Sequence, residues 1–386
     1  MRRLILSLTL MMFCTGVAAE QIGTPKVATR PVAEASPAKP SPKPAKKKAP
    51  APKLPPAREL FGSVTAPAPL EARSIGGYAK GCLSGGLSLP INGPDWQVMR
   101  LSRNRNWGNP RLIDYLERLS SDARAFDGWS GLLVGDMSQP RGGPMLTGHT
   151  SHQVGLDADI WLTPMPDRIL TPQEREEMSA VSMLKDPLTV DPTKFTIMQV
   201  KIIKRAASYP QVARIFVHPA IKKSLCAQAD AVGKDRSWLG KVRPWWNHYY
   251  HFHVRLTCPP GQKGCENQNP VTGDDGCGKE LDNWFAMLKK SAIWTAQQPP
   301  PDPDAKPAPK KKQLKLTDLP SDCKTVLTAG GTELLDVDDE LPPSALKAAA
   351  SKEAGPPLPR LSETQLEILI AGGKLGMPLP DRNPVR

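Results

Sequence analysis

The central part of the chain alternates between two hydrophobic patterns. Residues 110–121 and 196–207 space their apolar side chains three and four positions apart, which predicts amphipathic helices. Residues 131–134, 212–217 and 251–256 are short and apolar or alternating, which predicts strands. Helices that alternate with short strands in this way are typical of an α+β domain.

The two ends of the chain differ from this central part in composition. Of the 43 prolines among 386 residues, ten lie in residues 20–60 and six in residues 299–310, whereas all nine tryptophans lie between Trp96 and Trp294. This distribution is typical of one globular domain with disordered extensions. It excludes a polytopic membrane protein, a collagen-like chain and a fully disordered chain.

The first 19 residues have the three parts of a secretory signal peptide. Arg2 and Arg3 precede an apolar stretch over residues 4–13, and small residues lead up to Ala19. Because the apolar stretch is too short to span a bilayer comfortably, a cleaved signal is favoured over an anchor. We therefore expect export to the periplasm, with no transmembrane segment after cleavage.

The chain is basic, with a formal net charge of +13, and much of that charge lies in the proline-rich extensions. Such extensions can attract nucleic acid, anionic lipid or an acidic wall polymer, and charge alone does not choose between them. No recognised nucleic-acid-binding motif is present, so we expect no nucleic-acid partner. A lysine- and proline-rich segment over residues 31–57 reads as an extended spacer or tether.

Six cysteines remain after the signal is removed, and an even number in an exported protein predicts three disulfides with fifteen possible pairings. Cys258 and Cys265 enclose a short loop rich in turn-forming residues, which makes them plausible local partners. A zinc site built from cysteines is disfavoured, because no CxxC spacing occurs and the compartment is oxidising.

Five of the six histidines fall in two clusters. One cluster holds His149 and His152 with Asp157 and Asp159 close behind, and the other holds His248, His251 and His253. In a strand, His251 and His253 share one face, and so do the two aspartates, so spacing does not decide which aspartate is a ligand. It does not decide which histidines bind metal either. Two histidines and one carboxylate around Zn²⁺ leave a position open, as in hydrolytic sites.

The isolated His218 is expected to have only a structural role. The clustered histidines are different, because packing alone does not explain five of them beside two carboxylates. A metal ion there would polarise a carbonyl and make water more acidic, and a further histidine would serve as a base or as a donor to an oxyanion.

At these residues the chain resembles the penicillin-insensitive murein endopeptidases, a group of zinc peptidases related to lysostaphin-type enzymes, D-Ala-D-Ala peptidases and the hedgehog fold. The resemblance covers about residues 74–330. The matching motifs are Ser74–Gly77, Gly81–Cys82, Trp96–Arg100, Arg118–Ser120, Gly148–Ile160, Arg214–Val217, Pro219–Lys222, Lys241–Trp245 and Gly276–Gly278.

The resemblance implies a role for each clustered histidine. It implies that His152, Asp159 and His253 ligate zinc, and that His149 lies close enough to be an extra ligand. It also implies that His251 is the base and that His248 orients the substrate or stabilises the oxyanion, while Asp157 is a neighbour of the site. The disulfide pairs that the resemblance implies are Cys82–Cys323, Cys226–Cys277 and Cys258–Cys265.

We expect from the resemblance an α+β domain whose small antiparallel sheet carries the zinc site, flanked by helices and disulfide-braced loops. The expected substrate is the D-alanyl–meso-diaminopimelyl cross-link of peptidoglycan. A zinc D,D-carboxypeptidase and a non-catalytic wall-binding protein are the alternatives. The basic linker is a candidate tether to an anionic wall or membrane surface. The expected boundaries are signal 1–19, linker 20–73, catalytic domain 74–296, arm 297–330 and a tail of unknown role 331–386.

Overall fold

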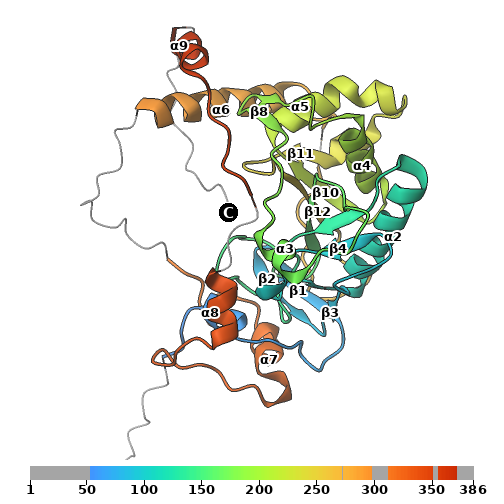
Figure 1. Ribbon diagram of the computed structural model, residues 1–386. Coiled ribbons are helices and arrows are strands. Elements are labelled where there is room, and N and C mark those ends of the chain that lie inside the picture. The colour runs from blue at the N-terminus through green and yellow to red at the C-terminus, as the bar shows by residue number, and fades with distance from the viewer. Residues whose placement is uncertain (1–52, 272, 298–311, 351–354, 372–386) are drawn as a thin grey trace, which may run out of the picture. The chain divides into compact units, whose positions relative to one another are not determined.

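Short apolar segments pair into a six-stranded sheet at the centre of the computed structural model, which describes residues 53–271, 273–297, 312–350 and 355–371. In spatial order the strands are β11 (Val242–Pro244), β10 (Val212–Val217), β12 (His251–Leu256), β7 (Asp157–Trp161), β6 (Leu132–Val134) and β4 (Trp96–Val98) (Figure 1). The predicted strands over 131–134, 212–217 and 251–256 are among them.

The sheet is mixed, which corrects the prediction of an antiparallel one. The four inner strands are antiparallel, but β4 runs parallel to β6 and β11 runs parallel to β10. A parallel pair needs a long crossover connection. Helix α2 (Pro110–Asp127) supplies it between β4 and β6, and helix α5 (Pro219–Gln228) supplies it between β10 and β11.

The two faces of the sheet differ in chemistry because side chains alternate along each strand. On β12, Phe252 and Val254 enter the main apolar core, whereas His251 and His253 point to the opposite face. Helices α2 and α4 (Ile197–Ser208) contribute their apolar faces to this core. In Figure 1 both helices lie on the same side of the sheet. One face of the sheet is therefore closed by helices, and the other carries the polar residues.

Local capping sets the bounds of the two predicted helices. The side chain of Asn109 accepts a hydrogen bond from the Arg111 amide at the start of α2, and Gly128 ends the helix with a φ of 72°. Thr196 and Gln199 form a capping box at the start of α4. Helix α2 continues beyond the predicted residue 121 because the first residue able to end it in the left-handed conformation is Gly128.

The remaining elements surround the sheet. The other helices are α1 (Ala57–Gly62), α3 (Pro172–Glu177), α6 (Lys279–Gln297), α7 (Asp322–Thr328), α8 (Pro343–Ala350) and α9 (Glu363–Ala371). The short hairpins pair β1 (Arg73–Gly77) with β2 (Lys80–Ser84), β3 (Leu87–Ser88) with β5 (Trp107–Gly108), and β8 (Leu184–Asp186) with β9 (Thr189–Val190). The described chain is thus a mixed α+β domain braced by disulfides, which confirms the predicted fold class.

Two predicted extensions contain structure that belongs to the domain. Ala57, Leu60 and Phe61 of α1 are buried in a second apolar cluster, which Leu316 and Val326 join from the other end of the chain. The linker predicted over 20–73 and the arm predicted over 297–330 therefore extend too far, since proline-rich composition conceals short apolar segments that pack on each other. The signal over 1–19 and the linker residues up to 52 lie outside the described residues.

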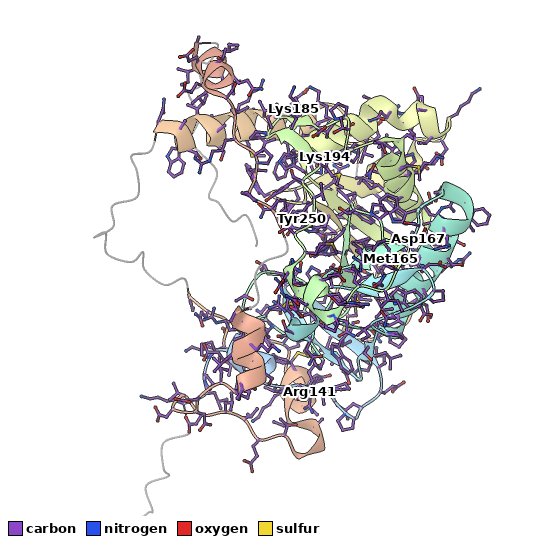
Figure 2. The ribbon with its side chains drawn as sticks, viewed as in Figure 1. Arg141, Met165, Asp167, Lys185, Lys194 and Tyr250 are labelled. Carbon is purple, nitrogen blue, oxygen red and sulfur yellow. A yellow bond between two sulfur atoms is a disulfide. The ribbon has the colours of Figure 1, made fainter. Side chains whose placement is uncertain are left out.

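Arg141 connects this second cluster to the main domain. Its guanidinium Nη1 donates to the carbonyl oxygens of Val326, Leu327 and Ala329, at 2.9, 2.6 and 3.0 Å, at the C-terminal end of α7. Figure 2 shows Arg141 beside that helix. A cation at this position satisfies carbonyls that the helix leaves unpaired.

Three disulfides join Cys82 to Cys323, Cys226 to Cys277, and Cys258 to Cys265, the same pairs that the resemblance implies. The first spans 241 residues of sequence and lies fully buried within the second apolar cluster. The last spans only 7 residues.

The double variant Cys82→Ala/Cys323→Ala should lower the free energy of unfolding by about 2–5 kcal/mol. The reason is that this disulfide closes a very long loop, and the loss on removal grows with loop length. Urea denaturation followed by circular dichroism measures it. The matched control is Cys258→Ala/Cys265→Ala, which opens a short loop and should cost less; an equal or larger loss in the control would contradict the argument.

No helix in the described part of the chain is both long enough and apolar enough to cross a membrane. The tail predicted over 331–386 contains the helices α8 and α9.

Candidate metal centre

Two neighbouring strands hold the centre of the histidine cluster. In the antiparallel pairing of β7 with β12, Asp159 lies opposite His253 and Asp157 lies opposite Arg255. Residues opposite each other project to the same face. The Nδ1 atom of His253 consequently lies 3.1 Å from Oδ1 of Asp159, although the geometry is not that of a hydrogen bond.

The loop before β7 supplies the other two histidines. His149 Nε2 lies 3.4 Å from Oδ2 of Asp159, and His152 Nε2 lies 3.5 Å from Oδ1. His152 adopts a φ of 67°, in the left-handed region that residues other than glycine rarely occupy. Its amide donates to Oδ2 of Asp157 at 3.0 Å, which holds this backbone in place. Strain of this kind is concentrated at functional sites.

The donor set fits a divalent metal ion. The ligand atoms of His149, His152 and Asp159 all lie within 4.8 Å of one another. Both ring nitrogens of His152 and Oδ1 of Asp159 are buried and lack a hydrogen-bond partner. Buried polar atoms without partners are costly and uncommon. Imidazole nitrogens and a carboxylate oxygen facing one point are the ligands that Zn²⁺ takes in proteins.

Asp157 lies behind His253 and orients it. Its Oδ1 atom is 3.0 Å from Nε2 of His253 and accepts a hydrogen bond from Nε of Arg255 at 2.8 Å. Burial by itself would raise the pKa of Asp157, but Arg255 and His253 outweigh burial and hold that pKa well below its usual range. The ionised carboxylate therefore accepts a hydrogen bond from the Nε2–H group of His253, which leaves the Nδ1 lone pair of His253 facing Asp159.

A second buried aspartate supports His149, and no prediction included it. Oδ2 of Asp136 lies 3.1 Å from His149 Nε2 and accepts hydrogen bonds from Arg103 at 2.9 Å and Arg105 at 2.8 Å. Burial alone would raise the pKa of Asp136, but Arg105, His149 and Arg103 together lower it well below its usual value. The only feature of the sequence that could have indicated Asp136 is its position two residues after β6, the strand that lies beside β7.

The remaining two histidines approach from the β11–β12 connection and from β12 itself. His248 has a φ of 50°, and its Nδ1 lies 2.6 Å from the Trp246 carbonyl oxygen, so Nδ1–H donates there. The rings of His248 and His251 are 4.9 Å apart. Burial lowers the pKa of His251 to about 4, so its imidazole is neutral at pH 7. A neutral buried imidazole can accept a proton.

Aromatic and apolar side chains line this end of the site. The Tyr250 ring lies 4.4 Å from that of His251, and Tyr250 also packs against a cluster that includes Trp161 and Met165. Tyr250 and Met165 are labelled in Figure 2. These side chains exclude water from the buried side of His251, whose Nδ1 has no hydrogen-bond partner.

The ring of His218 is not part of the cluster and has a structural role, as expected, although the His218 amide donates to the carbonyl oxygen of His248 at 2.9 Å. Its Nδ1 accepts a hydrogen bond from the Ala220 amide at 3.2 Å, which caps the N-terminus of α5. Burial lowers the pKa of His218 to about 3, so the ring stays neutral and able to accept this bond. The structure thus brings together all five clustered histidines with Asp159, and it leaves His218 out.

The chain is similar to known murein hydrolases over this region. The family model described as penicillin-insensitive murein endopeptidase matches residues 74–328. A penicillin-insensitive murein endopeptidase of Haemophilus influenzae is 46% identical over 236 residues, which cover 60% of this chain and 80% of the relative. Proteins of the same name from Klebsiella pneumoniae and Yersinia enterocolitica are 41% and 42% identical, and the matches cover 62% of this chain and 85% and 86% of the relatives.

Proposed function

The chain belongs to the family of penicillin-insensitive murein endopeptidases, and from that premise we propose that it hydrolyses the peptide cross-links of peptidoglycan at a zinc centre. The observation that carries the proposal is the set of buried, unpartnered donor atoms on His152 and Asp159, which face His149 and His253. A non-catalytic wall-binding protein has no need for such a costly arrangement.

We assign the metal to His152, Asp159 and His253, with His149 as a further donor close by. The proximity of His149, His152 and Asp159 supports this set, and the Asp157–His253 contact adds the fourth residue by fixing its ring. Bound there, Zn²⁺ would polarise the scissile carbonyl and lower the pKa of water. His149 is the most accessible of the four, with its side chain 25% exposed, which suits a donor that withdraws when substrate enters.

His251 is proposed as the general base. Its Nε2 atom lies 3.6 Å from Oδ2 of Asp159, so its ring reaches the space in front of the metal ligands. Because the buried imidazole is neutral at pH 7, it can take the proton from the attacking water and return it to the leaving amine.

His248 is proposed to stabilise the developing oxyanion or to orient the substrate. Its Nδ1–H is held by the Trp246 carbonyl, which fixes the direction of the ring beside His251. The substrate that we assign is the D-alanyl–meso-diaminopimelyl bond. No serine is acylated in such a reaction, so a β-lactam would find no nucleophile to trap.

Digestion of purified cross-linked muropeptide dimers tests the proposed function. The protein comprising residues 20–386 should convert dimers to monomers, a chelator should abolish the reaction, and Zn²⁺ should restore it, as read by mass spectrometry. Intact dimers from folded, zinc-loaded protein would overturn the proposal. Loss of terminal D-alanine in the same spectra would identify a carboxypeptidase instead.

The variant Asp157→Asn should weaken zinc binding by about 10- to 100-fold, because an amide is a poorer acceptor for the Nε2–H of His253 and no longer fixes the tautomer. Competition with a chromophoric chelator measures the affinity. The control is Asp186→Asn. Asp186 is a buried aspartate that accepts hydrogen bonds from the Leu188 amide and the Thr189 hydroxyl in the β8–β9 hairpin, so this change should leave zinc affinity unchanged. Equal affinities of wild type and Asp157→Asn would contradict the role of Asp157.

We also propose that the enzyme acts in the periplasm and that its basic N-terminal linker binds the anionic wall. Residues 20–60 carry nine lysines and arginines against three glutamates. Deleting residues 20–52, which spares helix α1, should reduce the fraction of protein that sediments with isolated sacculi, and the reduction should shrink at high salt. Equal sedimentation of both proteins at low salt would rule the tether out.

A further inference from the structure

An arginine on the neighbouring strand lies on the same face of the sheet as the metal ligands. In the antiparallel pairing of β10 with β12, Phe216 is opposite His253 and Arg214 is opposite Arg255. Opposite residues in such a pair point to the same face, and diagonal neighbours are roughly 7–8 Å apart. Arg214 is thus a diagonal neighbour of His253.

Arg214 differs from the arginines around it in its partners. Arg255 pairs with Asp157, and Arg243, opposite Phe216 on β11, pairs with Glu280. Arg214 donates from Nη2 to the carbonyl oxygen of Asn269 at 2.5 Å. Among the described residues, no carboxylate lies within ion-pair distance of Arg214. Burial lowers the pKa of Arg214, and the nearby positive charges of Arg255 and Arg243 lower it further.

The half-buried guanidinium therefore carries a charge that the protein itself does not neutralise. An arginine keeps its proton in such a setting, and its planar fork fits a carboxylate. None of its nitrogens is among the buried atoms without a hydrogen-bond partner. Its N–H groups beyond the bond to Asn269 thus remain accessible to a ligand.

Other arginines near the cluster do not have this freedom. Arg103 and Arg105 bind Asp136. Arg100 donates to the carbonyl oxygens of Arg175 and Met178. Within the described part of the chain Arg100 has no carboxylate partner either, but it is buried and stacks on Trp161. An anion that enters beside β12 would therefore meet Arg214 as the more accessible of these two cations.

We propose that Arg214 is a specificity residue that binds a free carboxylate of the stem peptide. The inference rests on the proposed function, because the assigned cross-link supplies the anion. In a diaminopimelyl residue, the carbon that bears the amide nitrogen of the cross-link also bears a carboxylate, so a negative charge lies a few bonds from the scissile carbonyl. The glutamyl residue of the stem peptide carries a second carboxylate further away.

Phe216 forms the floor between the metal ligands and this arginine. Its ring lies 5.3 Å from that of His253 and 5.7 Å from that of Trp245, and the Arg255 guanidinium lies 5.2 Å above it. A substrate that extends from the metal over this ring would bring its carboxylate toward Arg214. This contact would bind the carboxylate equally in the ground state and in the transition state. Its loss should therefore raise KM and leave kcat nearly unchanged.

The experiment compares three dimers: one with free carboxylates, one amidated at the diaminopimelyl carboxylate and one amidated at the glutamyl carboxylate. Wild-type enzyme should lose about 10- to 100-fold in kcat/KM on one of the amidated dimers, through KM, and that dimer identifies the carboxylate. The variant Arg214→Gln should lose a similar factor on the free dimer and be indifferent to the same amidation. The control Arg118→Gln, on an exposed arginine of α2, should behave as wild type.

Wild-type enzyme that cleaves all three dimers equally well would overturn the inference without any variant, so it stays testable if Arg214→Gln fails to fold. An Arg214→Gln enzyme as sensitive to amidation as wild type would overturn it too, since Arg214 would then only anchor the loop at Asn269. Failure of the proposed function looks different, because wild-type enzyme would cleave none of the dimers.

Discussion

His152→Ala should lose its zinc and at least about a thousandfold in turnover together. His152 is completely buried, and both of its ring nitrogens lack a hydrogen-bond partner, so its main contribution would be to the metal. A Lewis acid that stabilises charge in the transition state lowers the activation free energy by several kcal/mol, and its loss therefore corresponds to a factor of this size. Metal content after dialysis, measured by mass spectrometry of the element, and dimer cleavage are the two readouts.

The matched control for this variant is His218→Asn. It removes another buried histidine but leaves a side chain that can cap α5 through its carbonyl oxygen. This control should keep both zinc and activity. A His152→Ala protein that retains stoichiometric zinc after dialysis would mean that His152 is not a ligand, whatever its activity.

His251→Ala should keep its zinc and lose about 10²- to 10⁴-fold in kcat, the usual contribution of a general base. The two effects separate because His251 lies two residues before His253 on β12, with its Nε2 3.6 Å from Asp159 Oδ2, and is not needed to complete the donor set. KM should change little, since the lost interaction is made in the transition state. Steady-state cleavage of a fluorescent dimer and metal analysis of the same sample measure both.

Two results would contradict this assignment in different ways. Turnover within a few-fold of wild type would remove His251 as base. Loss of zinc together with turnover would place it among the ligands, beside His253. The variant His248→Ala extends the comparison, because a residue that stabilises the oxyanion should also lower kcat without releasing metal.

Local chemistry was enough to predict two helices that pack behind the sheet and one of the strands that carry the site. The apolar spacing of residues 110–121 and 196–207 predicted two helices that the structure confirms, because capping residues such as Asn109 and Thr196 lie next to the segments that they cap. The alternation over 251–256 predicted β12 with its full range. These signals are short in range, and so they can be recognised in one sequence.

The same local rules failed where packing joins distant segments. Residues 57–62 and 316–328 are flanked by prolines and lysines, so composition favoured disordered extensions. In the structure they pack on each other around the Cys82–Cys323 disulfide, with the carbonyls of α7 held by Arg141. A few apolar side chains form a core only when a partner segment covers them, and that partner lies more than 200 residues away.

The sequence by itself determined that the histidines are clustered, that His251 and His253 share a face, and that Asp157 and Asp159 do too. It did not determine which aspartate lies against the histidines. The register of β7 against β12 decided that. It sets Asp159 opposite His253 and Asp157 opposite Arg255, and the guanidinium of Arg255 pairs with the Asp157 carboxylate. Asp136 likewise depends on tertiary structure, since Arg103, Arg105 and His149 converge on it only in the folded chain. Spacing along a strand selects a face, but the pairing of strands selects the neighbours, and a metal ligand is defined by its neighbours.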